Sequence, residues 1–113
     1  MADACLFCRI VLGEVPATIV ASNADCMAFR DINPAAPTHV LVIPKVHVAS
    51  LNDVTDFATV AAMMQMAQEV ARGEAIAESG YRVVFNTNRH GGQTVAHLHL
   101  HVLGGRRMVW PPG

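Results

Sequence analysis

The chain has 113 residues, of which 52% are hydrophobic and 15% charged, with a formal net charge of −1. These proportions predict one globular domain over residues 1–113. The balanced charge, without a long run of either sign, argues against nucleic acid and anionic membranes as partners. The stretch MADACLFCRIVLGEVPA has no basic leader, and Arg9, Gly13 and Glu14 interrupt its apolar run, so we expect a cytoplasmic protein without a signal peptide or membrane span.

The first half of the chain predicts a short helix followed by strands. LFCRIVLGEVPA places Leu6, Ile10 and Phe7 on one helical face, and Gly13 is the expected end of the helix. TIVASNADCMAFRDI predicts a hairpin, because two β-rich runs flank the turn-forming residues 22–25. The loop INPAAPT then leads into the β-rich run HVLVIPK, which Pro44 ends.

The second half predicts one long helix and two more strands. From about Asp53 to Ser79 apolar residues recur at spacings of three and four, and Gly80 is the expected stop; they are Phe57, Val60, Ala61, Met64, Ala67, Val70 and Ala71. YRVVFN and TVAHLHLHVL alternate with period two around TNRHGGQ. The predicted fold class is α+β: a five-stranded, mostly antiparallel sheet with one long helix and a short N-terminal helix.

The segment HLHLHVLGG places His97, His99 and His101 on alternate residues. Successive side chains of a strand point to opposite faces, so the three imidazoles are expected on one face and the leucines on the core face. Three interpretations stand at this point. The histidines are structural, or an H-x-H pair chelates a catalytic Zn²⁺, or the middle imidazole is a nucleophile toward phosphorus.

The same residues resemble a known family. HLHLHVLGG fits the signature of the histidine triad superfamily, and FRDINPAAPTHVLVIPKVH, GYRVVFN, GGQTVAHLHLHVLGG and WPPG are similar to its Hint branch. The resemblance implies a nucleoside phosphoramidase or nucleotidyl hydrolase that is a homodimer, with a purine nucleoside monophosphate as bound product. The expected substrate is an adenosine 5′-phosphoramidate.

The resemblance also implies roles for individual residues. His99 matches the nucleophile that forms a nucleotidyl-histidine, while His101, Asn86 and Thr94 match catalytic positions that contact the phosphate or the leaving group. Asp31 matches the position that binds the ribose hydroxyls. The nucleotide-binding positions implied in this way are Phe7, Phe29, Arg30, Asp31, Ile32, Leu41, Asn86, Gly92, Gln93, Thr94, His99 and His101. Arg30 and the additional Arg107 depart from the pattern of the animal members.

Cys5-x-x-Cys8 suggests a metal or redox pair, because a reducing compartment disfavours a disulfide. With His47 and His97 the pair completes a tetrahedral Zn²⁺ set, and bacterial members of the triad family are similar in having these residues. We therefore expect one structural zinc per chain, with unused buried thiols and redox chemistry as the alternatives. Cys26 is expected to be a core residue and His39 to hydrogen-bond near the triad.

Two alternatives to the expected hydrolase remain open on sequence alone. A purine-nucleotide-binding regulatory module would keep the pocket with little turnover. A zinc-dependent hydrolase would use the His-x-His strand to activate water.

Overall fold

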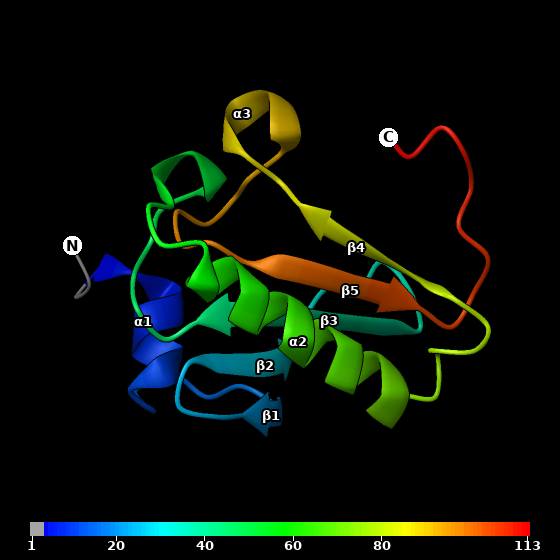
Figure 1. Ribbon diagram of the computed structural model, residues 1–113, viewed down its shortest axis with the longest axis horizontal. Helices are drawn as coiled ribbons and strands as arrows, with labels where there is room; N and C mark the ends of the chain where they lie inside the picture. The colour runs from blue at the N-terminus through cyan, green and yellow to red at the C-terminus, as the bar shows by residue number, and fades with distance from the viewer. Residues whose placement is uncertain (1–3) are drawn as a thin grey trace.

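The computed structural model describes residues 4–113, so the first three residues of the expected domain lie outside the described part of the chain (Figure 1). Five strands form one antiparallel sheet in the order β1-β2-β3-β5-β4, which confirms the α+β class. The elements in chain order are α1 (Leu6–Val11), β1 (Ile19–Ser22), β2 (Cys26–Arg30), β3 (Thr38–Pro44), the 3₁₀ turn η2 (Leu51–Asp53), α2 (Ala58–Gly73), β4 (Tyr81–Phe85), α3 (Asn88–Gly91) and β5 (Leu100–Gly104).

The two faces of the sheet have separate cores. The long helix α2 crosses one face (Figure 1), and there it covers a cluster that includes Ala28, Val42, Leu100 and Val102. The intervening residues of the same strands point to the opposite face, where Phe7 of α1 and neighbouring apolar residues form a smaller cluster. Leu98 and Leu100, which lie between the histidines, face α2. The side chains of His99 and His101 therefore lie on the opposite face of the sheet, beside α1.

The hairpin of β1 and β2 and the short helix α1 occur where the sequence predicts them. The Asn23 side chain accepts hydrogen bonds from the backbone N–H groups of Asp25 and Cys26, which closes the turn. Gly13 ends α1 in a left-handed conformation, with φ of 77°. The predicted buried face of α1 was wrong at Leu6, which is exposed, whereas Phe7, Cys8 and Ile10 are buried.

The long helix is shorter than predicted. It spans Ala58–Gly73, where 53–79 was expected, and Ala75 turns left-handed directly after it. Gly80 therefore ends a following turn and not the helix. Met63 and Met66 are buried, whereas the expected core residues Phe57 and Met64 are exposed. No helix of the described residues combines the length and the apolar character needed to cross a bilayer.

The last strand begins later than predicted, so His97 and His99 precede β5 and only His101 lies within it. The antiparallel register pairs Val42 with Leu100, which would place Leu98 opposite Pro44. Proline has no backbone N–H to continue the ladder. The Leu98 N–H donates instead to the Val48 carbonyl at 2.6 Å, and the segment leaves the sheet. The predicted turn 87–93 also contains a short helix, α3.

Candidate functional site

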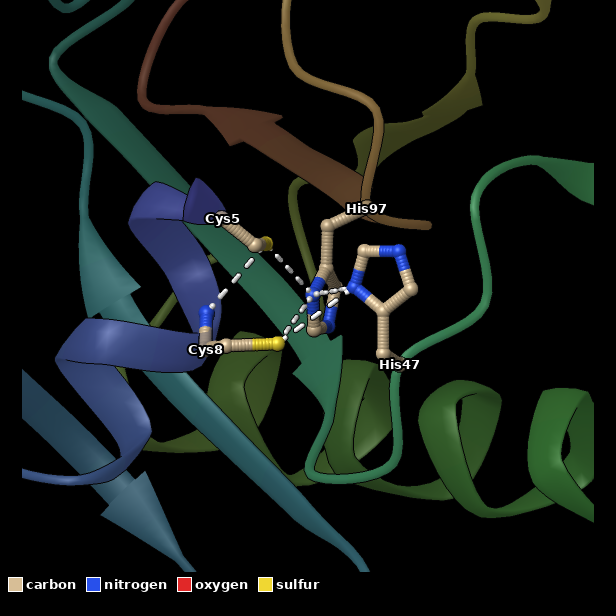
Figure 2. A group of neighbouring side chains, drawn as sticks. All are labelled: Cys5, Cys8, His47 and His97. Carbon is tan, nitrogen blue, oxygen red and sulfur yellow. Dashed lines mark hydrogen bonds between the residues drawn. The ribbon is translucent and has the colours of Figure 1, made fainter. Parts of the chain in front are cut away.

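Two cysteines of the N-terminal helical segment face two histidines from different loops (Figure 2). His97 Nδ1 lies 3.2 Å from Cys5 Sγ, 3.5 Å from Cys8 Sγ and 3.2 Å from His47 Nδ1. Cys8 Sγ lies 3.3 Å from His47 Nδ1. All four ligand atoms fall within 4.8 Å of one another, as the sequence predicted for a metal site.

The donor set fits zinc. Tetrahedral Zn²⁺ with bonds of about 2.0–2.3 Å separates its nitrogen and sulfur ligands by about 3.3–3.8 Å, close to the spacings in this cluster. The Nε2–H of His97 donates to the Pro44 carbonyl at 2.9 Å, so the Nδ1 of the neutral ring carries a lone pair toward the sulfurs. Burial lowers the pKa of His97, which favours the neutral ligand form, while burial and Cys5 raise the pKa of the Cys8 thiol.

A pocket of about 300 Å³ opens beside this cluster, on the α1 face of the sheet. Its volume is at the lower end of the range for small-molecule sites. The structure brings together there most of the residues that the resemblance assigned to nucleotide binding, namely Phe7, Phe29, Arg30, Asp31, Ile32, Leu41, Thr94, His99 and His101. The residues that line the pocket are mainly apolar, and His99 and His101 are among them. This lining suits a ligand in which a flat apolar group is joined to an anion.

The backbone fixes the proton position on His99. Its Nδ1 lies 2.7 Å from the carbonyl oxygen of His97, which can only accept a hydrogen bond. Nδ1 therefore carries the proton, and Nε2 of the neutral ring carries a free lone pair. The ring also packs edge-on against Phe7, with centroids 5.2 Å apart. His99 is thus buried, held in one orientation and equipped with a nucleophilic nitrogen.

A second chain of hydrogen bonds fixes the proton on His101. The Ala35 N–H donates to His39 Nδ1 at 3.0 Å, so the proton of neutral His39 is on Nε2. That Nε2 donates to His101 Nδ1 at 2.8 Å, which leaves the His101 proton on its own Nε2. Within the described residues this last nitrogen is buried without a partner. The expectation that His39 hydrogen-bonds near the triad is confirmed.

The pKa of His101 is lowered to about 4, mainly by burial and also by the neighbouring rings of His99 and His39, against a raising effect of Asp31. Burial also lowers the pKa of His39, while Asp31 opposes the shift. At neutral pH both rings are therefore uncharged. His101 presents a neutral N–H donor rather than a cation.

The loop after β2 brings a carboxylate to the pocket but holds a guanidinium elsewhere. Asp31 Oδ1 accepts the Asn33 N–H at 2.8 Å, and Oδ2 lies 3.4 Å from His39 Nε2. The guanidinium of Arg30 forms a bidentate ion pair with Glu74, at 2.6 and 3.0 Å. Arg30 lines the pocket, but its guanidinium is paired with Glu74 at the end of α2. The sequence did not predict this ion pair.

Three residues of the sequence-based set do not line this pocket. Gly92 ends α3 with φ of 79°, and Asn86 packs its backbone against Gly91. Gln93 joins three loop segments, because its Nε2 donates to the carbonyls of Ala49 and Val95 and its Oε1 accepts from the Asn88 N–H. Gln93 therefore holds the segment that leads to the histidines.

Sequence reasoning missed part of the pocket wall, formed by Leu6, Ile10, Val15, Pro16, Ala17, Asn33 and Val95. Val15, Pro16 and Ala17 follow α1 without any periodic pattern, so only the packing of α1 onto the sheet brings them there. Pro44 was read only as the end of a strand. Its carbonyl, which orients His97, had no signal in the sequence.

Comparisons with known proteins agree with this geometry. The sequence model described as the HIT domain matches residues 12–108. A protein named purine nucleoside phosphoramidase from Escherichia coli K12 is 46% identical over 94% of this chain and 91% of its own length. The crystal structure of a HIT family hydrolase from Legionella pneumophila superposes with a TM-score of 0.94 at 54% identity, covering 96% of this chain and 99% of that chain. A Zn-bound histidine triad family protein from Mycobacterium smegmatis has a TM-score of 0.84 at 37% identity, with coverages of 94% and 78%.

Proposed function

Because the chain belongs to the HIT domain family, we propose that it hydrolyses purine nucleoside phosphoramidates, with adenosine as the preferred nucleoside. The name of the Escherichia coli relative supports this activity. The observation that carries the proposal is the pairing of two imidazoles of opposite orientation beside an apolar pocket: Nδ1 of His99 faces a carbonyl, and Nδ1 of His101 faces the ring of His39.

In the proposed first step, Nε2 of His99 attacks the α-phosphorus and the P–N bond to the amine breaks. The amine takes a proton from solvent water as it leaves, and the nucleotidyl group becomes bonded to Nε2 of His99; the water molecule that attacks in the second step returns a proton to the solvent. Charge that develops on the phosphoryl oxygens needs donors that are already oriented. The Nε2–H of His101 supplies one, and Thr94 lines the same pocket. Asn86 is proposed to assist from the loop after β4.

In the second step a water molecule attacks the same phosphorus, the His99–P bond breaks, and the nucleoside monophosphate is released with neutral His99 restored. The hydrogen bond from His99 Nδ1–H to the His97 carbonyl becomes stronger while the ring carries positive charge. Asp31 is proposed to accept hydrogen bonds from the ribose hydroxyls, and Phe7, Phe29, Ile32 and Leu41 to surround the base. Gly92 and Gln93 are proposed to contact the nucleotide, and Arg30 to border the pocket.

The zinc that fits Cys5, Cys8, His47 and His97 would contribute stability rather than chemistry. A four-ligand site leaves no open position for water or substrate. The site would anchor α1 to the loop before β5, and α1 contributes Phe7 to the pocket beside His99. One zinc per chain is therefore proposed as a structural element of the active centre.

A panel of nucleoside phosphoramidates tests the proposal. Steady-state hydrolysis should be fastest for adenosine or guanosine 5′-phosphoramidates and slower for pyrimidine analogues. A chain that binds the monophosphate but turns over no member of the panel would instead be a nucleotide-binding regulatory module. A rate that depends wholly on added Zn²⁺ in a folded protein would indicate a zinc-dependent hydrolase.

We also propose that one histidine triad domain spans residues 1–113 and that two copies form a homodimer. The strand β4 is at the edge of the sheet. Its outer surface exposes Tyr81 and Val83, and Val109 and Trp110 of the tail are also exposed. Unprotected apolar edge strands favour pairing with another chain.

A further inference from the structure

The loop between β2 and β3 carries two groups that face the proposed active centre. Asp31 begins the loop and lines the pocket. Ala35 donates its N–H to His39 Nδ1 at 3.0 Å, the bond that starts the hydrogen-bond chain to His101. Ala35 is exposed, so packing around this residue does not hold its amide in place.

The segment after β5 packs against the same loop. A Cβ atom added to Gly105 would lie 2.8 Å from Pro37 Cβ, so the backbone of Gly105 lies close against the Pro37 ring. Next in the chain, Arg106 Nη2 donates to the Ala35 carbonyl at 2.9 Å, and Nη1 donates to the Arg107 carbonyl at 3.1 Å. One guanidinium thus joins Ala35 to the tail, and no carboxylate of the described residues pairs with it.

We propose that Arg106 is a positioning residue for the reaction proposed above: by holding Ala35, it keeps His39 and His101 in the tautomers that leave a donor on His101 Nε2. The inference rests on the proposed function and extends it to a residue outside the pocket. Arg106 acts through Ala35 and His39 and touches no reacting atom.

The physical reason is the strict alternation of donors and acceptors along this chain. Asp31 Oδ2, 3.4 Å from His39 Nε2, also favours a proton on that nitrogen. If Ala35 moves away, however, His39 Nδ1 becomes free to take the proton, and His39 Nε2 then becomes an acceptor. Two lone pairs would face each other across the 2.8 Å between His39 Nε2 and His101 Nδ1. The His101 proton would move to Nδ1 to relieve this contact, and Nε2 would lose the hydrogen that a phosphoryl oxygen needs.

The test compares Arg106→Ala, Arg106→Lys and Arg107→Ala in the zinc-loaded full chain. Arg107 is the matched control, because it is the adjacent exposed arginine and its side chain forms no hydrogen bond or ion pair among the described residues. Two quantities are measured for each protein: kcat with an adenosine phosphoramidate, and the imidazole ¹⁵N shifts of His39 and His101, which distinguish the two neutral tautomers. Thermal melting reports whether each variant is folded.

We expect Arg106→Ala to lower kcat by about tenfold, as for loss of orientation at a distance from the chemistry, and to shift His39 and His101 away from the Nε2–H tautomer. Arg106→Lys should recover part of both quantities, because its ammonium can still donate to the Ala35 carbonyl. Arg107→Ala should match the wild type.

Folded Arg106→Ala with wild-type kcat, or with reduced kcat but unchanged tautomers, would overturn the inference. Should the wild type itself fail to hydrolyse any phosphoramidate, the proposed function fails. The histidine spectra would then still decide separately whether Arg106 sets the tautomers.

Discussion

At the scale of single residues, backbone groups decide where the protons of the histidines lie. The carbonyl of Pro44 takes the Nε2–H of His97, and the carbonyl of His97 takes the Nδ1–H of His99. The N–H of Ala35 imposes the opposite tautomer on His39. Identical side chains therefore offer a lone pair toward the two cysteines on His97, a lone pair on Nε2 of the neutral His99 ring and, through His39, a donor on His101.

Replacement of His99 by alanine should abolish turnover while nucleotide binding and the fold remain. Loss of the nucleophile is expected to lower kcat by more than the ~10²–10⁴ that general acid–base assistance provides. His101→Ala should be the milder variant, because it removes one donor to the phosphate. Parallel measurements of kcat and of adenosine monophosphate affinity check this, and a His99→Ala rate within tenfold of the wild type would contradict the covalent route.

The half-buried His101 also predicts how stability depends on pH. Its pKa is lowered from 6.5 to about 4 in the folded chain, mainly by burial. Between these two values the unfolded chain binds a proton that the folded chain does not, so the free energy of unfolding should fall as pH drops from about 6.5 toward 4. Melting curves across this range should show a shallower dependence for His101→Gln than for the wild type. Identical slopes would contradict the lowered pKa.

At the scale of elements, the central contact is between α1 and the segment before β5. Phe7 of α1 packs against the rings of His97 and His99, at centroid distances of 5.8 and 5.2 Å. The two cysteines approach His97 from the same helical segment. Whatever loosens this contact should disturb the metal site and the pocket together.

A zinc held by four protein ligands would take no part in the reaction, so its removal should lower the melting temperature more than the initial rate of the chain that stays folded. Cys8→Ser should bind less than one zinc per chain by elemental analysis and retain activity in its folded fraction. Cys26→Ser is the control for loss of a buried thiol, because Cys26 lies in β2 within the other core cluster. A stripped protein that stays folded, loses all activity and regains it with Zn²⁺ would contradict a structural role.

The order and type of the helices and strands were largely predictable from the sequence, because residues within or next to each element determine where it ends. Asn23 closes its hairpin with its own side chain, and Gly13 ends α1 by adopting a positive φ. The start of β5 was not predictable. It depends on Pro44, which is distant in the sequence and comes opposite Leu98 only through the register of β3 and β5.

Much of the candidate site was also predictable, because most of its residues lie in recognisable sequence motifs. Motif resemblance identified the histidines and the four candidate metal ligands, which the fold brings together. The ion pair of Arg30 with Glu74 had no local signal, because it depends on where α2 ends relative to β2. The contacts of Ala35 with His39 and of Arg106 with Ala35 were likewise absent from any spacing pattern, since each involves a backbone group of Ala35.

At the scale of the whole molecule, both edge strands of the sheet expose apolar residues. The edge strand β1 has four residues and exposes Ile19, whereas β4 has five residues and exposes Tyr81 and Val83. The tail after β5 is tied to β4, because Arg82 donates to the Val109 carbonyl at 2.9 Å. This edge is the surface that the proposed homodimer would use.

Sedimentation at micromolar concentration should find a dimer, and Val83→Lys should shift it toward monomer by placing charge on the edge of the sheet. Met64→Lys, at an exposed position of α2, should leave the dimer unchanged. A wild-type chain that sediments as a monomer, or two variants that behave alike, would contradict the edge-strand dimer.

In the proposed reaction His99 becomes covalently bonded to the nucleotide. Rapid mixing of the wild type with an adenosine phosphoramidate, followed by intact-mass measurement at neutral pH, tests this step most directly. We expect a transient species heavier by one adenylyl group, located on His99 by peptide mapping and absent from His99→Ala. Full turnover with no such species at any time, or an adduct on another residue, would contradict it.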